Sequence, residues 1–233
     1  MKEMRITMIE VDDLIKRYPT LADSRAAIEL AVSKLCGTIA SGGTILLCGN
    51  GGSAADAEHI AGELMKSFIK PRPLNENLKR NLVRIGGELG AALAATLQTP
   101  IRALPLTGMP ALSTAFANDA DPYFVFAQQA LAFADANSTL IGISTSGNSK
   151  NVIAACIAAK ARGSFTIGLT GQSGGKMKDI CDLTITVPET ETYKIQELHL
   201  PIYHAICIAV ENYFVGLIMN SKISEAPTMK NSL

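Results

Sequence analysis

The sequence predicts an α/β fold, a three-layer, doubly wound structure built on a five-stranded parallel sheet. Five short aliphatic runs lack the alternation of apolar and polar residues that marks half-exposed strands, so they indicate strands buried on both faces. Helix-compatible stretches alternate with these runs, as in the connections between parallel strands. Gly- and Ser-rich loops follow three of the runs, where such sheets bind ligands. The expected strands are residues 44–48, 103–106, 139–143, 165–169 and 183–187.

Helices are expected before, between and after these strands. Apolar residues within 8–40 are spaced as in one or two amphipathic helices, and Ser41, Gly42 and Gly43 end this N-terminal arm. A long helix near the C-terminal end is expected to present, with this arm, more apolar surface than one sheet face can cover. The other expected elements are helices at 53–68, 111–135, 149–162 and about 194–219, and a flexible tail at about 220–233.

The composition predicts one compact domain spanning 1–233. The chain has 233 residues, 48% of them apolar, which is enough for a single core with an added helical arm. Lys and Arg total 21 and Asp and Glu total 21, so no basic field is available to bind a phosphate backbone. Because the chain also has no Trp and only 5% aromatic residues, we expect no nucleic acid partner.

The cysteines and the N-terminal segment predict a soluble cytoplasmic protein. The five cysteines share no CxxC spacing and lie in apolar stretches, as expected for buried thiols in a reducing compartment. Residues 1–18 mix charged and apolar side chains too finely for a signal peptide. No run of 18 apolar residues occurs, so no membrane partner is expected.

Three loops at the predicted ligand edge of the sheet carry glycines and hydroxyl groups. They are residues 49–53, which include Asn50, Gly51, Gly52 and Ser53, residues 144–149 and residues 170–176. Hydroxyls and backbone N–H groups at helix N-termini bind anions, phosphate above all. The alternative is that these segments are tight turns, with Ser149 a helix N-cap.

The sequence also indicates which class of phosphate compound would bind. Residues 49–54 match G-x-G-x-x-A, but no acidic residue closes a second strand, as dinucleotide sites require. Residues 170–176 lack the spacing of a nucleotide-binding P-loop. These features favour a single phosphate on a small molecule over a nucleotide.

Polar residues on two helices form a candidate chemical site. His59 and Glu63 are four residues apart and share one helix face, whereas Gln196 and His204 are eight apart on the late helix. Imidazole, carboxylate and amide groups can form a four-coordinate zinc site, an acid and base pair, or a plain polar interface. His199 is expected to be a structural, hydrogen-bonding histidine.

Five segments in order carry a family resemblance: CGNGGSAADAEHIAGEL, FANDADPY, GISTSGNSKNVI, LTGQSGGKM and KIQELHLPIYH. Over about residues 10–215 the chain resembles the sugar isomerase (SIS) domain family with its flavodoxin-like fold, and within it the phosphoheptose isomerases. The resemblance implies a homotetramer with active sites at subunit contacts. It also implies a zinc ion bound by His59, Glu63, Gln196 and His204, with Glu63 as base and His204 as acid. The implied substrate contacts are Asn50, Gly51, Gly52, Ser53, Glu63, Asn118, Asp119, Ser144, Thr145, Ser146, Ser149 and Gln196.

The chain departs from the family pattern in two places. Tyr193 stands where the family carries an Asp, and Glu191 is a possible substitute. Residues about 70–100 occupy what is a short crossing in the family, and their apolar stripe predicts one or two helices packed on the rim of the site or on a neighbouring subunit. The stripe consists of Leu82, Val83, Leu89, Ala92, Leu93 and Leu97.

The implied function is aldose–ketose isomerisation. We expect sedoheptulose 7-phosphate to be converted to D-glycero-D-manno-heptose 7-phosphate by enediol proton transfer, for surface polysaccharide synthesis. Two alternatives stay open. One is a non-catalytic SIS-fold protein that binds sugar phosphate or acts as a partner like the DnaA initiator-associating protein. The other is an isomerase of a different phosphosugar.

Overall fold

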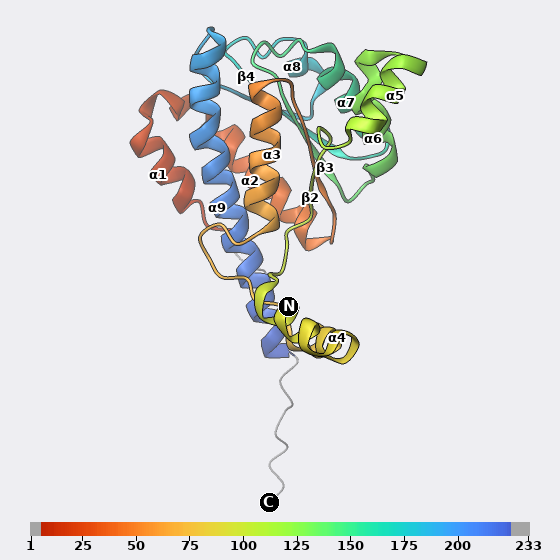
Figure 1. Ribbon diagram of the computed structural model, residues 1–233. Coiled ribbons are helices and arrows are strands. Elements are labelled where there is room, and N and C mark those ends of the chain that lie inside the picture. Colours follow the sequence, from red (N-terminus) through yellow and green to blue (C-terminus); the bar gives the residue numbers. More distant parts are fainter. Residues whose placement is uncertain (1–5, 225–233) are drawn as a thin grey trace, which may run out of the picture.

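The computed structural model describes residues 6–224, and part of the tail expected at 220–233 lies outside this range. Its centre is one parallel sheet in the order β2-β1-β3-β4-β5, which confirms the predicted fold class (Figure 1). All five predicted strands are present, and their ends agree to within one residue. The strands are β1 (Ile45–Cys48), β2 (Ala103–Pro105), β3 (Thr139–Ile143), β4 (Phe165–Thr170) and β5 (Leu183–Thr186).

Alternate strand residues face two separate cores. Leu47, Ile141 and Ile167 belong to the larger core, which helices at both ends of the chain cover. These helices are α1 (Ile9–Arg17), the 3₁₀ helix η1 (Pro19–Ser24), α2 (Arg25–Ala40), α3 (Gly52–Met65) and α9 (Thr192–Ser224). The expected N-terminal arm is therefore confirmed, as part of the helical layer that covers one face of the sheet.

Leu46 and Leu140 face the second core, on the opposite side of the sheet. The helix expected at 111–135 lies on this side and is split near Pro122, because this residue cannot donate the backbone hydrogen bond that a continuous helix needs. The four-residue helix α8 was not predicted. This side carries α5 (Pro110–Asp119), η2 (Pro122–Phe124), α6 (Val125–Phe133), α7 (Lys150–Ala161) and α8 (Met177–Ile180).

The predicted insertion forms α4 (Glu76–Thr96), which extends away from the sheet (Figure 1). Gly87 breaks the helix, with φ 54° and ψ −126°, so α4 consists of two helices, as the sequence allowed. The second helix folds back on the first, since a Cβ on Gly90 would lie 1.9 Å from the carbonyl oxygen of Leu82. Most side chains of α4 are exposed, so among the described residues it does not pack on the rim of the site, and packing on a neighbouring subunit stays a prediction.

Helix α9 is long and apolar enough to cross a membrane by length and composition. Half of its most apolar stretch is buried within the fold, and α1, α2 and α3 pack on it. Such burial is typical of the core helix of a globular protein. Pro201 lies inside α9 and removes one helical hydrogen bond between Gln196 and His204.

Candidate active site

The loop after β1 starts α3 with a sharp turn. Gly51 has φ 56°, and a Cβ on Gly49 would lie 2.4 Å from the carbonyl oxygen of Ser53, so both positions require glycine. Ser53 is 4% exposed in the first turn of α3. The N–H groups of Ser53, Ala54 and Ala55 already donate to the Asn50 and Gly51 carbonyls, so it is the positive end of the helix dipole that makes the position suited to an anion.

The loop after β3 folds on its own hydroxyl groups. The Ser144 and Ser149 hydroxyl oxygens lie 2.9 Å apart, and the Ser149 N–H donates to the Ser144 hydroxyl at 3.4 Å. The Ser149 hydroxyl does not cap α7, which argues against a simple N-cap role. Ser146 is exposed, and its hydroxyl accepts from the Asn148 N–H. Thr145 lies between these serines and is half-buried.

The loop after β4 supports this serine loop through the backbone. The Gly171 N–H donates to the Thr145 carbonyl at 2.9 Å, and the Lys176 N–H donates to the Asn148 side chain at 3.1 Å. Gly147 fits against Gly174, where a Cβ would lie 2.1 Å from the carbonyl oxygen. Residues 170–176 therefore hold the loop at 144–149 in place.

A cavity of about 500 Å³ opens beside these loops, between the ends of β1 and β3. The strand order reverses at this position, which is the usual ligand site of such sheets. The Lys150 Nζ lies 4.9 Å from the centre of the Tyr123 ring. Sequence reasoning missed this cation, since it considered only the loop before α7. The lining residues are Asn50, Pro122, Tyr123, Ser149, Lys150 and Asn151.

The far end of α3 carries the second part of the candidate site. The His59 Nε2 lies 3.2 Å from a Glu63 carboxylate oxygen, and the His59 and His204 ring centres are 5.1 Å apart. Tyr203 contacts the His59 Nδ1 at 3.1 Å and donates to Asp56 at 3.1 Å. The structure thus brings together the predicted His59, Glu63 and His204, and adds Tyr203 and Asp56, which sequence reasoning missed.

Burial and neighbouring charges set the protonation states of Glu63 and His204. Burial raises the pKa of Glu63, but Lys66 and His59 outweigh it and hold this pKa below its ordinary value. Burial lowers the pKa of His204, and His59 lowers it further. At neutral pH, Glu63 is therefore a carboxylate that can accept a proton, and His204 is a neutral imidazole.

Gln196 lies at the other end of the site. A Cβ on Gly52 would lie 2.4 Å from its Nε2, whereas His204 is eight residues along α9, about 12 Å by helical rise. The Nε2 of His204 is buried without a hydrogen-bond partner, and nitrogen and carboxylate donors suit zinc. However, within residues 6–224 no three His, Cys, Asp or Glu side chains already form a metal site.

The remaining predicted contacts lie on α5. Asn118 and Asp119 are exposed at its end, where the Asn118 amide donates to the Asp119 carboxylate at 2.9 Å. Their role as substrate contacts stays a prediction. His199 is fully buried and its Nε2 contacts the Thr170 carbonyl at 3.3 Å, which confirms its structural character.

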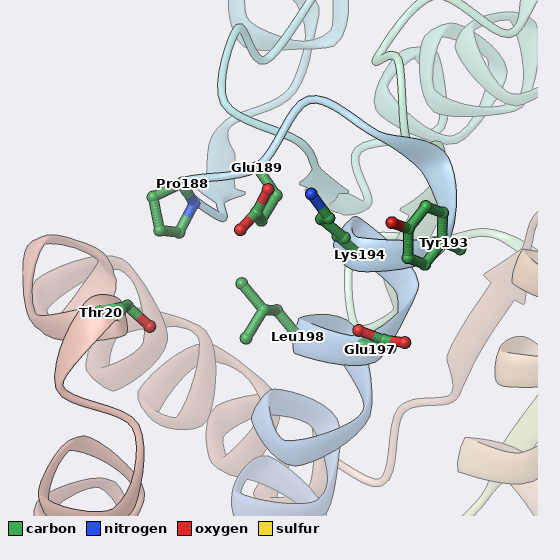
Figure 2. Close-up of a pocket in the computed structure, with 7 residues that line it drawn as sticks. All are labelled: Thr20, Pro188, Glu189, Tyr193, Lys194, Glu197 and Leu198. Carbon is green, nitrogen blue, oxygen red and sulfur yellow. The ribbon is translucent and has the colours of Figure 1, made fainter.

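Figure 2 shows a second cavity, of about 460 Å³, at the start of α9. Tyr193 and Lys194 line it from the first turn of this helix, and Thr20 faces them from η1. The cavity adjoins the loop at 170–176, because the Gln172 N–H donates to the carbonyl of Glu189, which lines the cavity. Glu191 pairs with Lys194 at 2.6 Å, so the possible substitute for the family Asp is already engaged.

Comparison with known proteins places this geometry in a family. The SIS domain model matches residues 10–83 and 83–171, and its two segments meet inside α4. Phosphoheptose isomerase of Burkholderia pseudomallei is 38% identical over 198 residues, which cover 84% of this chain and 87% of that protein. Phosphoheptose isomerase of Nitratiruptor sp. is 43% identical over 170 residues, covering 73% and 77%.

Solved structures agree with these relatives. Phosphoheptose isomerase GmhA from Neisseria gonorrhoeae superimposes with a TM-score of 0.65 at 31% identity, covering 88% of this chain and 93% of that one. A phosphoheptose isomerase from Francisella tularensis gives a TM-score of 0.66 at 26% identity, covering 86% and 97%.

Proposed function

Because the chain belongs to the SIS domain family and, within it, to the phosphoheptose isomerases, we propose that it converts sedoheptulose 7-phosphate to D-glycero-D-manno-heptose 7-phosphate. The observation that carries this proposal is the arrangement along α3. Ser53 lies at the anion-binding end of this helix, and Glu63 lies ten residues further on, beside His204. Helical side chains lean toward the N-terminus, so Glu63 leans toward the phosphate end.

The reaction needs a base and a group that exchanges protons with oxygen. Glu63 removes a proton from C1 of the ketose, and the electrons of that C–H bond form the C1–C2 double bond of an enediol. His204 supplies the proton taken up by the oxygen on C2 and accepts the proton released by the oxygen on C1. Return of the proton from Glu63 to C2 completes the aldose. The distant phosphate, bound by Ser53 and the loop at 144–149, holds the sugar chain in place.

We also propose a zinc ion held by His59, Glu63 and His204, whose donor atoms suit it. Such an ion would polarise the substrate oxygens. Because a carboxylate fully committed to zinc is a poor base, the ion would have to be held loosely enough for Glu63 to accept a proton. Within one subunit Gln196 lies against Gly52, so it would bind this ion only if it came from a neighbouring subunit. Chelation should lower turnover, and full turnover after exhaustive chelation would contradict the zinc proposal.

A homotetramer is part of the proposal. Six aliphatic side chains of the insertion and its end are 37–76% exposed, more than a monomer usually leaves uncovered on one element. They are Leu78, Val83, Ile85, Leu89, Leu93 and Leu97. Light scattering should give a tetramer, and a monomer at micromolar concentration would contradict it. Ile85→Asp with Leu89→Asp should give smaller species if α4 takes part, whereas Glu88→Ala at the same tip should not.

The proposed location is the cytoplasm, where the five buried, unpaired cysteines would stay reduced, and the proposed pathway is heptose synthesis for surface polysaccharide. The function is tested with a panel of ketose phosphates of five, six and seven carbons. Sedoheptulose 7-phosphate should have the highest kcat/KM. Faster turnover of a shorter sugar would reassign the substrate, and saturable binding without turnover would indicate a non-catalytic protein.

A further inference from the structure

A buried ion pair lies directly behind the catalytic end of α3. Arg72, in the segment that leads into the insertion, is 1% exposed, and Glu211 on α9 is 1% exposed. The Arg72 Nε lies 3.3 Å from a Glu211 carboxylate oxygen, without the alignment of a hydrogen bond. A buried ion pair is weak evidence for stability, because desolvation offsets the attraction. Its other contacts indicate what the pair does.

The Arg72 guanidinium binds the end of α3. Its two terminal nitrogens donate to the carbonyl oxygens of Leu64 at 2.8 Å and Glu63 at 3.3 Å. These carbonyls belong to the last turn of α3, where the helix itself offers no N–H partner. The carbonyl held by the second contact belongs to the same residue whose carboxylate is the proposed base. Arg72 therefore fixes the backbone from which that carboxylate extends.

Glu211 holds the segment that follows α3. One of its carboxylate oxygens accepts from the Phe68 N–H at 2.8 Å, and the other accepts from the N–H groups of Ile69 at 2.7 Å and Lys70 at 3.0 Å. The Phe68 ring lies 5.6 Å from the His204 ring, centre to centre. Glu211 thus secures the backbone of a residue that packs on the proposed acid.

The same pair is attached to the base of the insertion. The Thr99 N–H donates to the Arg72 carbonyl at 2.6 Å, and Pro73 pairs with Gln98 in an antiparallel bridge. The chain segments that enter and leave α4 therefore meet at Arg72.

We propose that Arg72 and Glu211 are positioning residues for the isomerisation, which hold the Glu63 carboxylate and the His204 imidazole in register with the substrate carbons. The inference rests on the proposed function, because it takes Glu63 and His204 as base and acid. Neither residue of the pair touches substrate. Loss of the pair should lower the rate of proton transfer and leave binding of the distant phosphate unchanged.

The test is Arg72→Lys in the full-length chain. Lysine keeps the positive charge beside Glu211 but lacks the planar fork that reaches two carbonyls. With sedoheptulose 7-phosphate, kcat should fall about tenfold or more while KM changes less than about twofold, since the lost interaction is realised in the transition state. Glu211→Gln should have the same effect, because its amide NH₂ would face backbone N–H groups that need an acceptor.

A control distinguishes positioning from general loss of stability. Ile28→Val removes one methylene from the larger core at α2, contacts neither Arg72 nor Glu211 through a hydrogen bond, and should lower Tm with kcat unchanged. If Ile28→Val and Arg72→Lys lower kcat equally for equal losses in Tm, the pair is only structural and the proposal is overturned.

A second readout does not depend on turnover. The chain has three histidines, so their side-chain NMR signals can be resolved. Arg72→Lys should shift the signals of His59 and His204 and leave that of His199, which binds the Thr170 carbonyl near the other end of the site. Unchanged His59 and His204 signals would overturn the positioning role even if the parent protein turned over no sugar, which would separately refute the proposed function.

Discussion

The two ends of α3 hold their functional groups in different ways. At the first end, glycine turns and serine hydroxyls close in sequence shape Ser53 and the loop at 144–149, and the backbone of residues 170–176 supports that loop. At the other end, Glu63 lies near His204 of α9, and its backbone carbonyl is bound by Arg72, whose buried partner Glu211 also lies on α9. We therefore expect binding of phosphate and transfer of protons to be separable properties of one helix.

This separation suits an isomerase. The phosphate does not change during the reaction, so neutral donors and helix N–H groups suffice to bind it. Proton transfer requires groups at a reactive carbon to stay within hydrogen-bonding distance while their charges change. A rigid support for Glu63 serves this second requirement.

The largest expected effect is at the proton-transfer end. Glu63→Gln keeps the volume but removes the base, so kcat should fall about 10²- to 10⁴-fold, with Tm and oligomeric state unchanged. Steady-state kinetics and thermal unfolding measure this. Glu58→Gln changes an exposed glutamate on the same helix and should have no effect. Full activity in Glu63→Gln would remove the functional difference between the two ends.

The next expected effect is on stability, at the buried His199, which lies on α9 between Gln196 and His204. Burial lowers its pKa to about 4, below its ordinary 6.5. Between these values the unfolded chain binds a proton that the folded chain does not, so stability is complete above pH 6.5 and falls as the pH drops. The loss should reach about 3 kcal/mol by pH 4. Urea unfolding at several pH values should show this loss, and His199→Gln should lack that part of it.

At the phosphate end, Ser146→Ala with Ser149→Ala should raise KM about tenfold or more and change kcat little, since hydrogen bonds to a charged group are lost. Ser41→Ala, at the end of α2, is the matched control. If the double variant bound substrate as tightly as the parent, the loop would be only a turn.

The smallest effect is expected at Lys150. This side chain is exposed, so Lys150→Met should raise KM only about threefold, and less in high salt. Lys160→Met, near the other end of α7, should leave KM unchanged. An equal change in both variants would show that Lys150 has no special place at the cavity.

The fold was predictable because its signals are local. Buried parallel strands appear as aliphatic runs, and the glycines after them mark the loops, so strand ends agreed to within one residue. The split between α5 and α6 was missed although Pro122 marks it, because the apolar spacing continues across the break. Helix α8 has only four residues and is too short for a periodic pattern.

Within the candidate site, only contacts that depend on spacing within one helix could be predicted from the sequence. His59 and Glu63 meet because residues four apart share a helix face. The contact between His59 and Tyr203 joins residues 144 positions apart, and Arg72 and Glu211 look like surface charges in the sequence. Gln196 and His204 share a helix, yet eight residues of helical rise keep them at different ends of the site.

Proton transfer by Glu63 between C1 and C2 can be followed by running the isomerisation in D₂O and locating deuterium in the product by NMR. The parent protein and Glu58→Gln should form an aldose with deuterium at C2, because the proton held by Glu63 exchanges with solvent. Glu63→Gln should form almost none of this product. An aldose with only protium at C2, formed equally fast by Glu63→Gln, would show that Glu63 is not the base.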